Sequence, residues 1–315
     1  IQYWKNKSAT NYSSQDSGHS STRSHAPGGS IRKKILALTN SYHGDTFGAM
    51  SVSERGAFTI AFQDYLFEVI FTDIDQPWSV KKEEWDEIAC FIYEPLVQGA
   101  GGMKMYDEFA LNALLAKCKQ HNIICIADEV MTGFGRTGRL FASDYVAEKP
   151  DIICLSKGIT GGMMALGATA CTQDIYDAFL SDDRSKTFFH GHSYTANPLA
   201  CAAANASLDL LLDNTCMENI NRIGEKHAAF ANHLLLNSSG NIKNIRHLGT
   251  ILAFELETNG SDGYLNNISS VLHQNALEKG VLLRPLGNTL YVMPPYCITD
   301  EELEKVYQCT EEIIQ

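Results

Sequence analysis

The sequence predicts an α/β fold whose mostly parallel sheet is covered on both faces, followed by a smaller α+β domain. Short β-rich runs alternate with helical stretches over the first two thirds of the chain, which is typical of parallel strands joined by crossover helices. Beyond about residue 210 the pattern changes to a long amphipathic helix and then to two separated apolar runs. We therefore divide the 315 residues into a large domain, 1–209, and a small domain, 210–315.

The elements of the large domain can be assigned in chain order. The first seven residues look like the end of a helix, and residues 109–121 place their apolar side chains on one helical face. Another helix is expected to begin at Asn197 as N-cap, with Pro198 at its first position. Strands are expected in the runs KILALT, FEVIFTD, IACFIYEPL, IICIADEV, DIICLSKGI and ALGATACT. Ligands of such sheets bind at the carboxyl ends of the strands.

Composition excludes several function classes. A net charge of −12 disfavours a nucleic-acid partner, and no apolar run is long enough to cross a membrane. The nine cysteines form no C-x-x-C and indicate reduced thiols in the cytoplasm. Residues 8–30 contain eight Ser and three Gly, and we expect them to be a flexible surface insertion.

A glycine pattern follows the fourth apolar run. Gly133, Gly135 and Gly138 form G-x-G-x-x-G, which in a βαβ unit binds a dinucleotide pyrophosphate. Here the acids Asp128 and Glu129 would lie close to that pyrophosphate, and no clear helical face follows the glycines. These features disfavour a dinucleotide site.

Two polar residues at strand ends favour a different cofactor. Asp128 ends one apolar run and Lys157 ends the next, just before a Gly-rich turn. An isolated Lys of this kind is usually a surface residue, but pyridoxal phosphate (PLP) needs both a Lys amine for its Schiff base and a carboxylate at its ring nitrogen. Tyr42 and Val130 could cover the two faces of the ring, or they could be core residues. Ser193, ahead of a helix, is a candidate phosphate contact.

A metal site is not expected. His190 and His192 are close in sequence, but nothing near them completes a ligand set.

Several motifs resemble those of one enzyme family, the class III aminotransferases of the fold-type I PLP-dependent superfamily. They are SYHGDTFGAMSVS, YEPLVQGAGGM, ADEVMTGFGRTG, LSKGITGG, NPLACAAANASL and LLRPLGNTLYVMPPY, in that order from about residue 31 onward. The resemblance implies PLP as cofactor, Lys157 as its attachment point, Asp128 at its ring nitrogen and a structural role for the glycines.

Within this family the chain is most similar to the diaminononanoate synthases of biotin synthesis. Family members that act on glutamate usually carry E-P-x-Q-G-E-G-G, in which the second Glu pairs with an Arg. In EPLVQGAGG, Ala100 stands in that place. The resemblance implies S-adenosylmethionine as amino donor and 8-amino-7-oxononanoate as acceptor. It also implies that Arg284 binds the acceptor's carboxylate and that Tyr42 and Gly191 contact substrate.

The resemblance further implies a homodimer with the active site at its interface, in which His192 and Ser193 reach the cofactor of the neighbouring subunit. His192 departs from the subgroup, which has Pro in H-G-P-T. The family's N-terminal Gly-Ser phosphate loop is not among these residues, and we interpret the chain as a fragment. Two other hypotheses stay open. One is another class III ω-aminotransferase that uses a diamine, lysine or β-alanine, and the other is a non-catalytic fragment.

Overall fold

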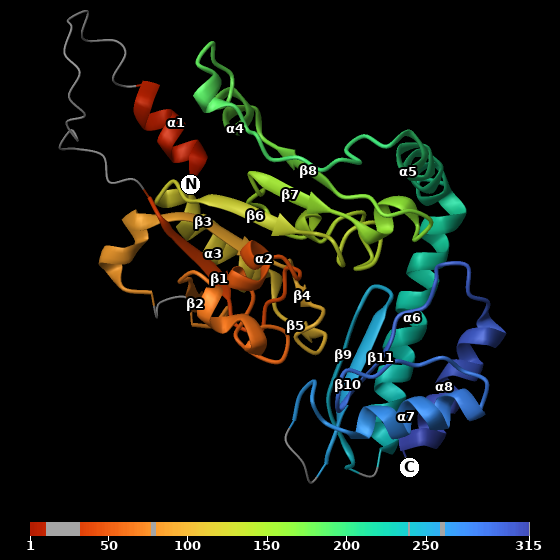
Figure 1. Ribbon diagram of the computed structural model, residues 1–315. Coiled ribbons are helices and arrows are strands. Elements are labelled where there is room, and N and C mark those ends of the chain that lie inside the picture. The colour runs from red at the N-terminus through yellow and green to blue at the C-terminus, as the bar shows by residue number, and fades with distance from the viewer. Residues whose placement is uncertain (11–31, 77–79, 239, 259–261, 315) are drawn as a thin grey trace, which may run out of the picture.

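The centre of the molecule is a six-stranded sheet in the order β2-β1-β3-β6-β7-β8 (Figure 1). The computed structural model describes residues 1–10, 32–76, 80–238, 240–258 and 262–314. In the sheet β8 runs antiparallel to β7, and the other neighbouring strands pair in parallel. The strands are β1 Lys34–Leu38, β2 Ile70–Thr72, β3 Ile88–Tyr93, β6 Ile124–Asp128, β7 Ile152–Leu155 and β8 Ala168–Cys171. Each lies within one of the six predicted runs, and the predicted α/β class is confirmed.

Helices and short connections surround this sheet. The helices are α1 Gln2–Thr10, α2 Phe47–Val52, α3 Glu108–Gln120, α4 Gln173–Asp177 and α5 Pro198–Leu211. The hairpin strands are β4 Val97–Gln98 and β5 Lys104–Met105, and the 3-10 turns are η1 Ile60–Tyr65, η3 Lys82–Glu87, η4 Ala142–Asp144, η5 Lys157–Thr160 and η6 Arg184–Lys186.

The two predicted helix signals are found. The face of α3 that carries Leu111, Leu114, Leu115 and Cys118 is buried. Asn197 caps α5 because its side chain accepts hydrogen bonds from the backbone N–H groups of Leu199 and Ala200.

Of the insertion expected at residues 8–30, the structure describes only residues 8–10. α1 continues to Thr10, so residues 8–10 are helical rather than part of a flexible segment. They extend a helix that has already been nucleated, which costs less than starting one. Residues 11–31 lie outside the described residues.

A three-stranded antiparallel sheet, β11-β10-β9, forms the second layer of structure. Its strands are β9 Ile242–Leu248, β10 Ile251–Leu256 and β11 Thr289–Val292, and its helices are α6 Asn214–Asn237, α7 Ile268–Glu278 and α8 Asp300–Ile314. In Figure 1, α6 runs along this sheet and its other end reaches α5. The domain boundary at residues 209 and 210 falls inside α5 and stays a prediction.

The two sheets share buried side chains. One apolar cluster joins β1, β3 and α3, and it also contains Ile251 and Ala253 of β10. Next to them, a Cβ added to Gly249 would lie 2.2 Å from the backbone carbon of Thr137. The backbones of the two parts therefore meet at a place that only glycine can occupy. Within the described ranges, none of the helices has the length and apolar character needed to cross a membrane.

Candidate active site

The carboxyl ends of three neighbouring strands gather the polar residues of the candidate site. Asp128 ends β6, Glu94 directly follows β3, and Lys157 comes two residues after β7. Because β6 pairs in parallel with both β3 and β7, these three residues lie along one edge of the sheet. This is the edge at which parallel sheets bind ligands.

Asp128 is held in one orientation. Its side chain is 10% exposed, and its Oδ2 lies 2.7 Å from Nδ1 of His43, whose side chain is 2% exposed. Its Oδ1 accepts a hydrogen bond of 3.1 Å from the backbone N–H of Val130. Nε2 of His43 is buried and has no hydrogen-bond partner among the described residues. A fixed, buried carboxylate is suited to hold a protonated ring nitrogen.

Glu94 is a second buried carboxylate at this edge. Its Oε1 and Oε2 accept hydrogen bonds from the backbone N–H groups of Tyr42 at 2.9 Å and Gly99 at 3.0 Å. Burial raises the pKa of Glu94 to about 7, although the nearby His43 and the two N–H groups oppose that increase. The site therefore contains a carboxyl group that changes charge near neutral pH.

Lys157 has an exposed side chain and an unusual backbone. Its φ angle is +47°, in the left-handed region that residues other than glycine rarely occupy. The preceding residue, Ser156, is extended and donates a hydrogen bond of 2.7 Å from Oγ to the carbonyl of Leu166. Such strain is typical of functional sites and persists only where the surroundings hold it.

The two residues expected to cover the cofactor's faces lie near Asp128. Tyr42 donates a hydrogen bond of 2.8 Å from its hydroxyl to Oδ1 of Asp45, and its ring contacts Phe58 at a centroid distance of 5.1 Å. Burial, and then the bond to Asp45, raise the pKa of Tyr42 to about 12. Val130 is half-buried. Their roles stay predictions.

The expected phosphate and substrate contacts Gly191, His192 and Ser193 lie on the exposed segment before α5. The backbone N–H of His192 donates a hydrogen bond of 3.0 Å to Oγ1 of Thr195. Across the described ranges, no hydrogen bond connects these three residues to Asp128 or Lys157. Their roles stay predictions.

Arg284 is exposed and lies outside the described strands, five residues before β11. The strand begins later, at Thr289, because Pro285 has no N–H to donate to a sheet. Burial raises the pKa of Tyr291, and the charge of Arg284 opposes that increase. In the part of the chain that the structure describes, Arg284 forms no hydrogen bond or ion pair, and its guanidinium is available to a ligand.

The glycine pattern forms a packed turn. Gly135 and Gly138 both have φ of +93°, and a Cβ on Gly135 would lie 2.6 Å from Cδ1 of Ile220 in α6. Glu129 is fully buried and accepts hydrogen bonds from Oγ1 of Thr132 and from the backbone N–H groups of Ala142 and Ser143. No helix begins at these glycines, and the acid beside Asp128 holds the turn together.

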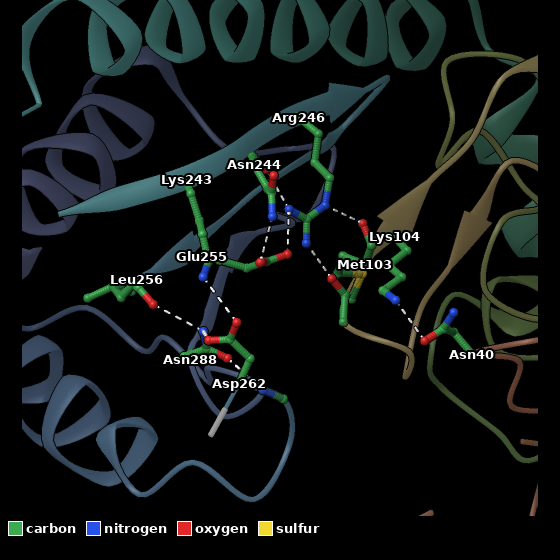
Figure 2. Close-up of polar contacts among 12 residues, drawn as sticks. Asn40, Met103, Lys104, Lys243, Asn244, Arg246, Glu255, Leu256, Asp262 and Asn288 are labelled. Carbon is green, nitrogen blue, oxygen red and sulfur yellow. Dashed lines mark hydrogen bonds and ion pairs between the residues drawn. The ribbon is translucent and has the colours of Figure 1, made fainter. Parts of the chain in front are cut away.

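A cavity of about 640 Å³ lies between the two sheets. Its lining includes Tyr42, Ala100 and Tyr264. Figure 2 shows one bridge across this joint, in which Arg246 donates from Nε to the carbonyl of Met103 at 2.8 Å and from Nη2 to that of Gly102 at 2.5 Å. Arg246 also lies 3.2 Å from Oε1 of Glu255. The bridge ties the Ala100 turn to the small sheet.

His43 and Glu94 were not among the predicted site residues. Both stand in the quoted motifs, and Glu94 directly follows an apolar run, as Asp128 ends one. An acid at the end of the neighbouring strand was the signal that could have identified it.

Comparison with known proteins identifies the family. The family model described as Aminotransferase class-III matches residues 7–314. The chain belongs to the class III aminotransferases. This membership agrees with the resemblance that the motifs indicated.

Three similar proteins support this placement among class III aminotransferases. Adenosylmethionine-8-amino-7-oxononanoate aminotransferase of Synechococcus elongatus is 44% identical over 299 residues, which cover 90% of this chain and 69% of that protein. The crystal structure of the protein of that name from Methanocaldococcus jannaschii has a TM-score of 0.86 at 31% identity, covering 100% of this chain and 71% of that one. A PLP-bound amine transaminase from an uncultivated Pseudomonas species has a TM-score of 0.85 at 29% identity, covering 99% and 72%.

Proposed function

We propose that this class III aminotransferase uses PLP to transfer an amino group from S-adenosylmethionine to 8-amino-7-oxononanoate, giving the 7,8-diaminononanoate of biotin synthesis. The observation that carries the reaction type is the pair of Asp128 and Lys157 at neighbouring strand ends. The choice of substrates is supported by the 44% identity to the Synechococcus elongatus protein named for that reaction.

The residues at the strand ends fit PLP. Asp128 is a buried carboxylate fixed by two hydrogen bonds, which suits a pyridinium nitrogen, and Lys157 offers an exposed amine for covalent attachment. Tyr42 and Val130 would flank the ring. When bound, PLP supplies an electron sink for the electrons of the substrate's Cα–H bond.

Each side chain then has a separate task. Asp128 keeps the ring nitrogen protonated, since its negative charge favours the cationic form. The amine of Lys157 would move the proton from the substrate's Cα to C4′ of the bound cofactor in the first half-reaction, and in the opposite direction in the second. Arg284 binds the carboxylate of the keto acid through the two parallel N–H groups of its guanidinium.

Ala100 bears on the choice of substrate. A Glu at this position, as in family members that act on glutamate, would compete with the substrate's carboxylate for an Arg. The methyl group of Ala100 cannot do so, and Arg284 forms no ion pair within the described residues. An Arg that is always available suits an enzyme in which one of the two substrates, the long keto acid, presents a distant carboxylate.

We also propose a homodimer with its active site at the subunit interface. The surface near α5 carries exposed apolar side chains, among them Leu199 at 71%, Leu210 at 72% and Tyr194 at 72%. Large exposed apolar side chains gathered near one element are typical of protein–protein interfaces. It adjoins Gly191, His192 and Ser193, which we propose to reach the partner's cofactor and substrate. Sedimentation at micromolar concentration should give twice the mass of one chain.

We also propose a cytoplasmic location, because the cysteines are free thiols. All nine cysteines are free thiols, and two of them, Cys171 and Cys297, are exposed. Free thiols are characteristic of reducing compartments.

Separate half-reactions test the proposed function. The PLP-loaded enzyme is mixed with one donor at a time: S-adenosylmethionine, a diamine, lysine or β-alanine. Loss of the cofactor's absorbance band is expected only with S-adenosylmethionine, and 8-amino-7-oxononanoate should restore it. Loss of the band with another donor alone would overturn the proposed donor, and an unchanged band with every donor would support a non-catalytic chain.

A further inference from the structure

The turn that carries Lys157 rests on one aromatic side chain. A Cβ placed on Gly158 would lie 2.9 Å from both Cβ and Cδ2 of Phe134, so the Gly158 backbone packs directly on Phe134. From the other side, Oγ of Ser207 in α5 donates a hydrogen bond of 3.3 Å to the carbonyl of Gly158. The turn is thus held between Phe134 and α5.

Phe134 is in turn held by Tyr296, a residue that follows β11 of the small sheet. It is 9% exposed, has a φ angle of +59°, and its carbonyl accepts a hydrogen bond of 2.8 Å from the hydroxyl of Tyr296. Phe134 and Lys157 are therefore two left-handed residues in contact through Gly158. A left-handed backbone at a residue with a side chain is strained and persists only where the surroundings impose it.

The hydroxyl of Tyr296 is itself fixed in place. The guanidinium of Arg136 lies 4.7 Å from the centre of the Tyr296 ring, and its Nη1 donates hydrogen bonds of 2.9 Å to the carbonyl of Pro294 and to Oγ1 of Thr250. This cation–π contact and the two bonds leave the ring one orientation, which directs the hydroxyl at Phe134.

We propose that Tyr296 is a positioning residue for Lys157. Its hydroxyl fixes the backbone of Phe134, and the side chain of Phe134 packs against Gly158. These two contacts hold the neighbouring Lys157 in its strained backbone conformation. β11 lies between Arg284 and Tyr296 in the chain. The residue proposed to bind the substrate's carboxylate and the residue proposed to position the Lys157 amine therefore flank the same strand. The inference rests on the proposed role of Lys157.

The variant Tyr296→Phe tests this because it removes one hydroxyl and keeps the ring over which Arg136 stacks. Hydrogen–deuterium exchange is measured on the cofactor-free protein for residues 156–161, where the amides of Ile159 and Gly161 bond to the carbonyls of Ser156 and Gly158. These amides should exchange roughly five- to ten-fold faster, as expected for the loss of one hydrogen bond. In the loaded enzyme kcat should fall by a similar factor while KM for the donor stays within about two-fold.

Tyr145→Phe is the matched control. The hydroxyl of Tyr145 donates a hydrogen bond of 2.7 Å to the carbonyl of Thr137 in the same glycine turn, but it does not contact Phe134's carbonyl. It should leave the exchange of residues 156–161 unchanged. Unchanged exchange there in Tyr296→Phe, or an equal increase in both variants, would overturn the proposal. A failure of the proposed function would look different, because the unmodified enzyme would then show no turnover while the exchange difference remained.

Discussion

Replacing Glu94 by Gln should change how the stability of the protein depends on pH. In the folded chain burial raises the pKa of Glu94 to about 7, from an ordinary value of 4.5. The folded chain therefore binds this proton more tightly than the unfolded chain does. The stability that the group contributes is complete below about pH 4.5 and is lost as the pH rises to about 7.

The magnitude follows from the difference between the two pKa values. At about 1.4 kcal/mol per pH unit, it corresponds to about 3 kcal/mol of unfolding free energy. Gln has nearly the same size but cannot ionise. Its amide group also faces one of the two N–H groups that Glu94 accepts from, which adds a cost that does not depend on pH. The change with pH is therefore the useful quantity, not the stability at a single pH.

The measurement is urea unfolding of the cofactor-free protein between about pH 5 and about pH 8. Relative to the unmodified protein, Glu94→Gln should gain about 2–3 kcal/mol over this range. Glu68→Gln is the control, since Glu68 is exposed, and its difference from the unmodified protein should stay flat. If the Glu94→Gln difference is equally flat, burial does not control the charge of Glu94 and the reasoning is refuted.

Four further variants, at three positions, test the proposed roles. Lys157→Ala should abolish turnover and remove the cofactor link that borohydride reduces, and a reducible adduct mapped to another lysine would rule out Lys157. Asp128→Asn should keep the fold but lose roughly two or more orders of magnitude in kcat, because the ring nitrogen loses its negative partner; turnover near that of the unmodified enzyme would contradict this. Arg284→Ala should raise KM for the keto acid roughly 10- to 100-fold and leave the donor half-reaction almost unchanged. Arg284→Lys should recover little, and equal slowing of both half-reactions would exclude a clamp for the acceptor.

Strand positions and the Asp128–Lys157 pair could be predicted from the sequence because the signal is local. Each strand is a short apolar run with polar boundaries, and each of the two residues stands at the end of such a run. Parallel pairing then places both at the same edge without further information.

The environment of Glu94 could not be predicted in this way. Burial raises its pKa, and His43 and the backbone N–H groups of Tyr42 and Gly99, which follow different strands, oppose that increase. The start of β11 could not be predicted from the apolar run that contains Pro285, because strand pairing begins only at Thr289. The role of Ser193 rests on the proposed homodimer, and no local sequence pattern describes a subunit interface.

The shared core of the two sheets has a consequence for folding. Ile251 and Ala253 of β10 belong to the same buried cluster as β1, β3 and α3, and Gly249 abuts the backbone of Thr137. Separating the two sheets would expose both sides of that cluster to water, at about 25 cal/mol for each Å² of apolar surface. We therefore expect the parts named as two domains to unfold together, which coincident transitions followed by different probes would show. A destabilising substitution in β10 should therefore also lower the stability of the large sheet, to which β10 does not belong.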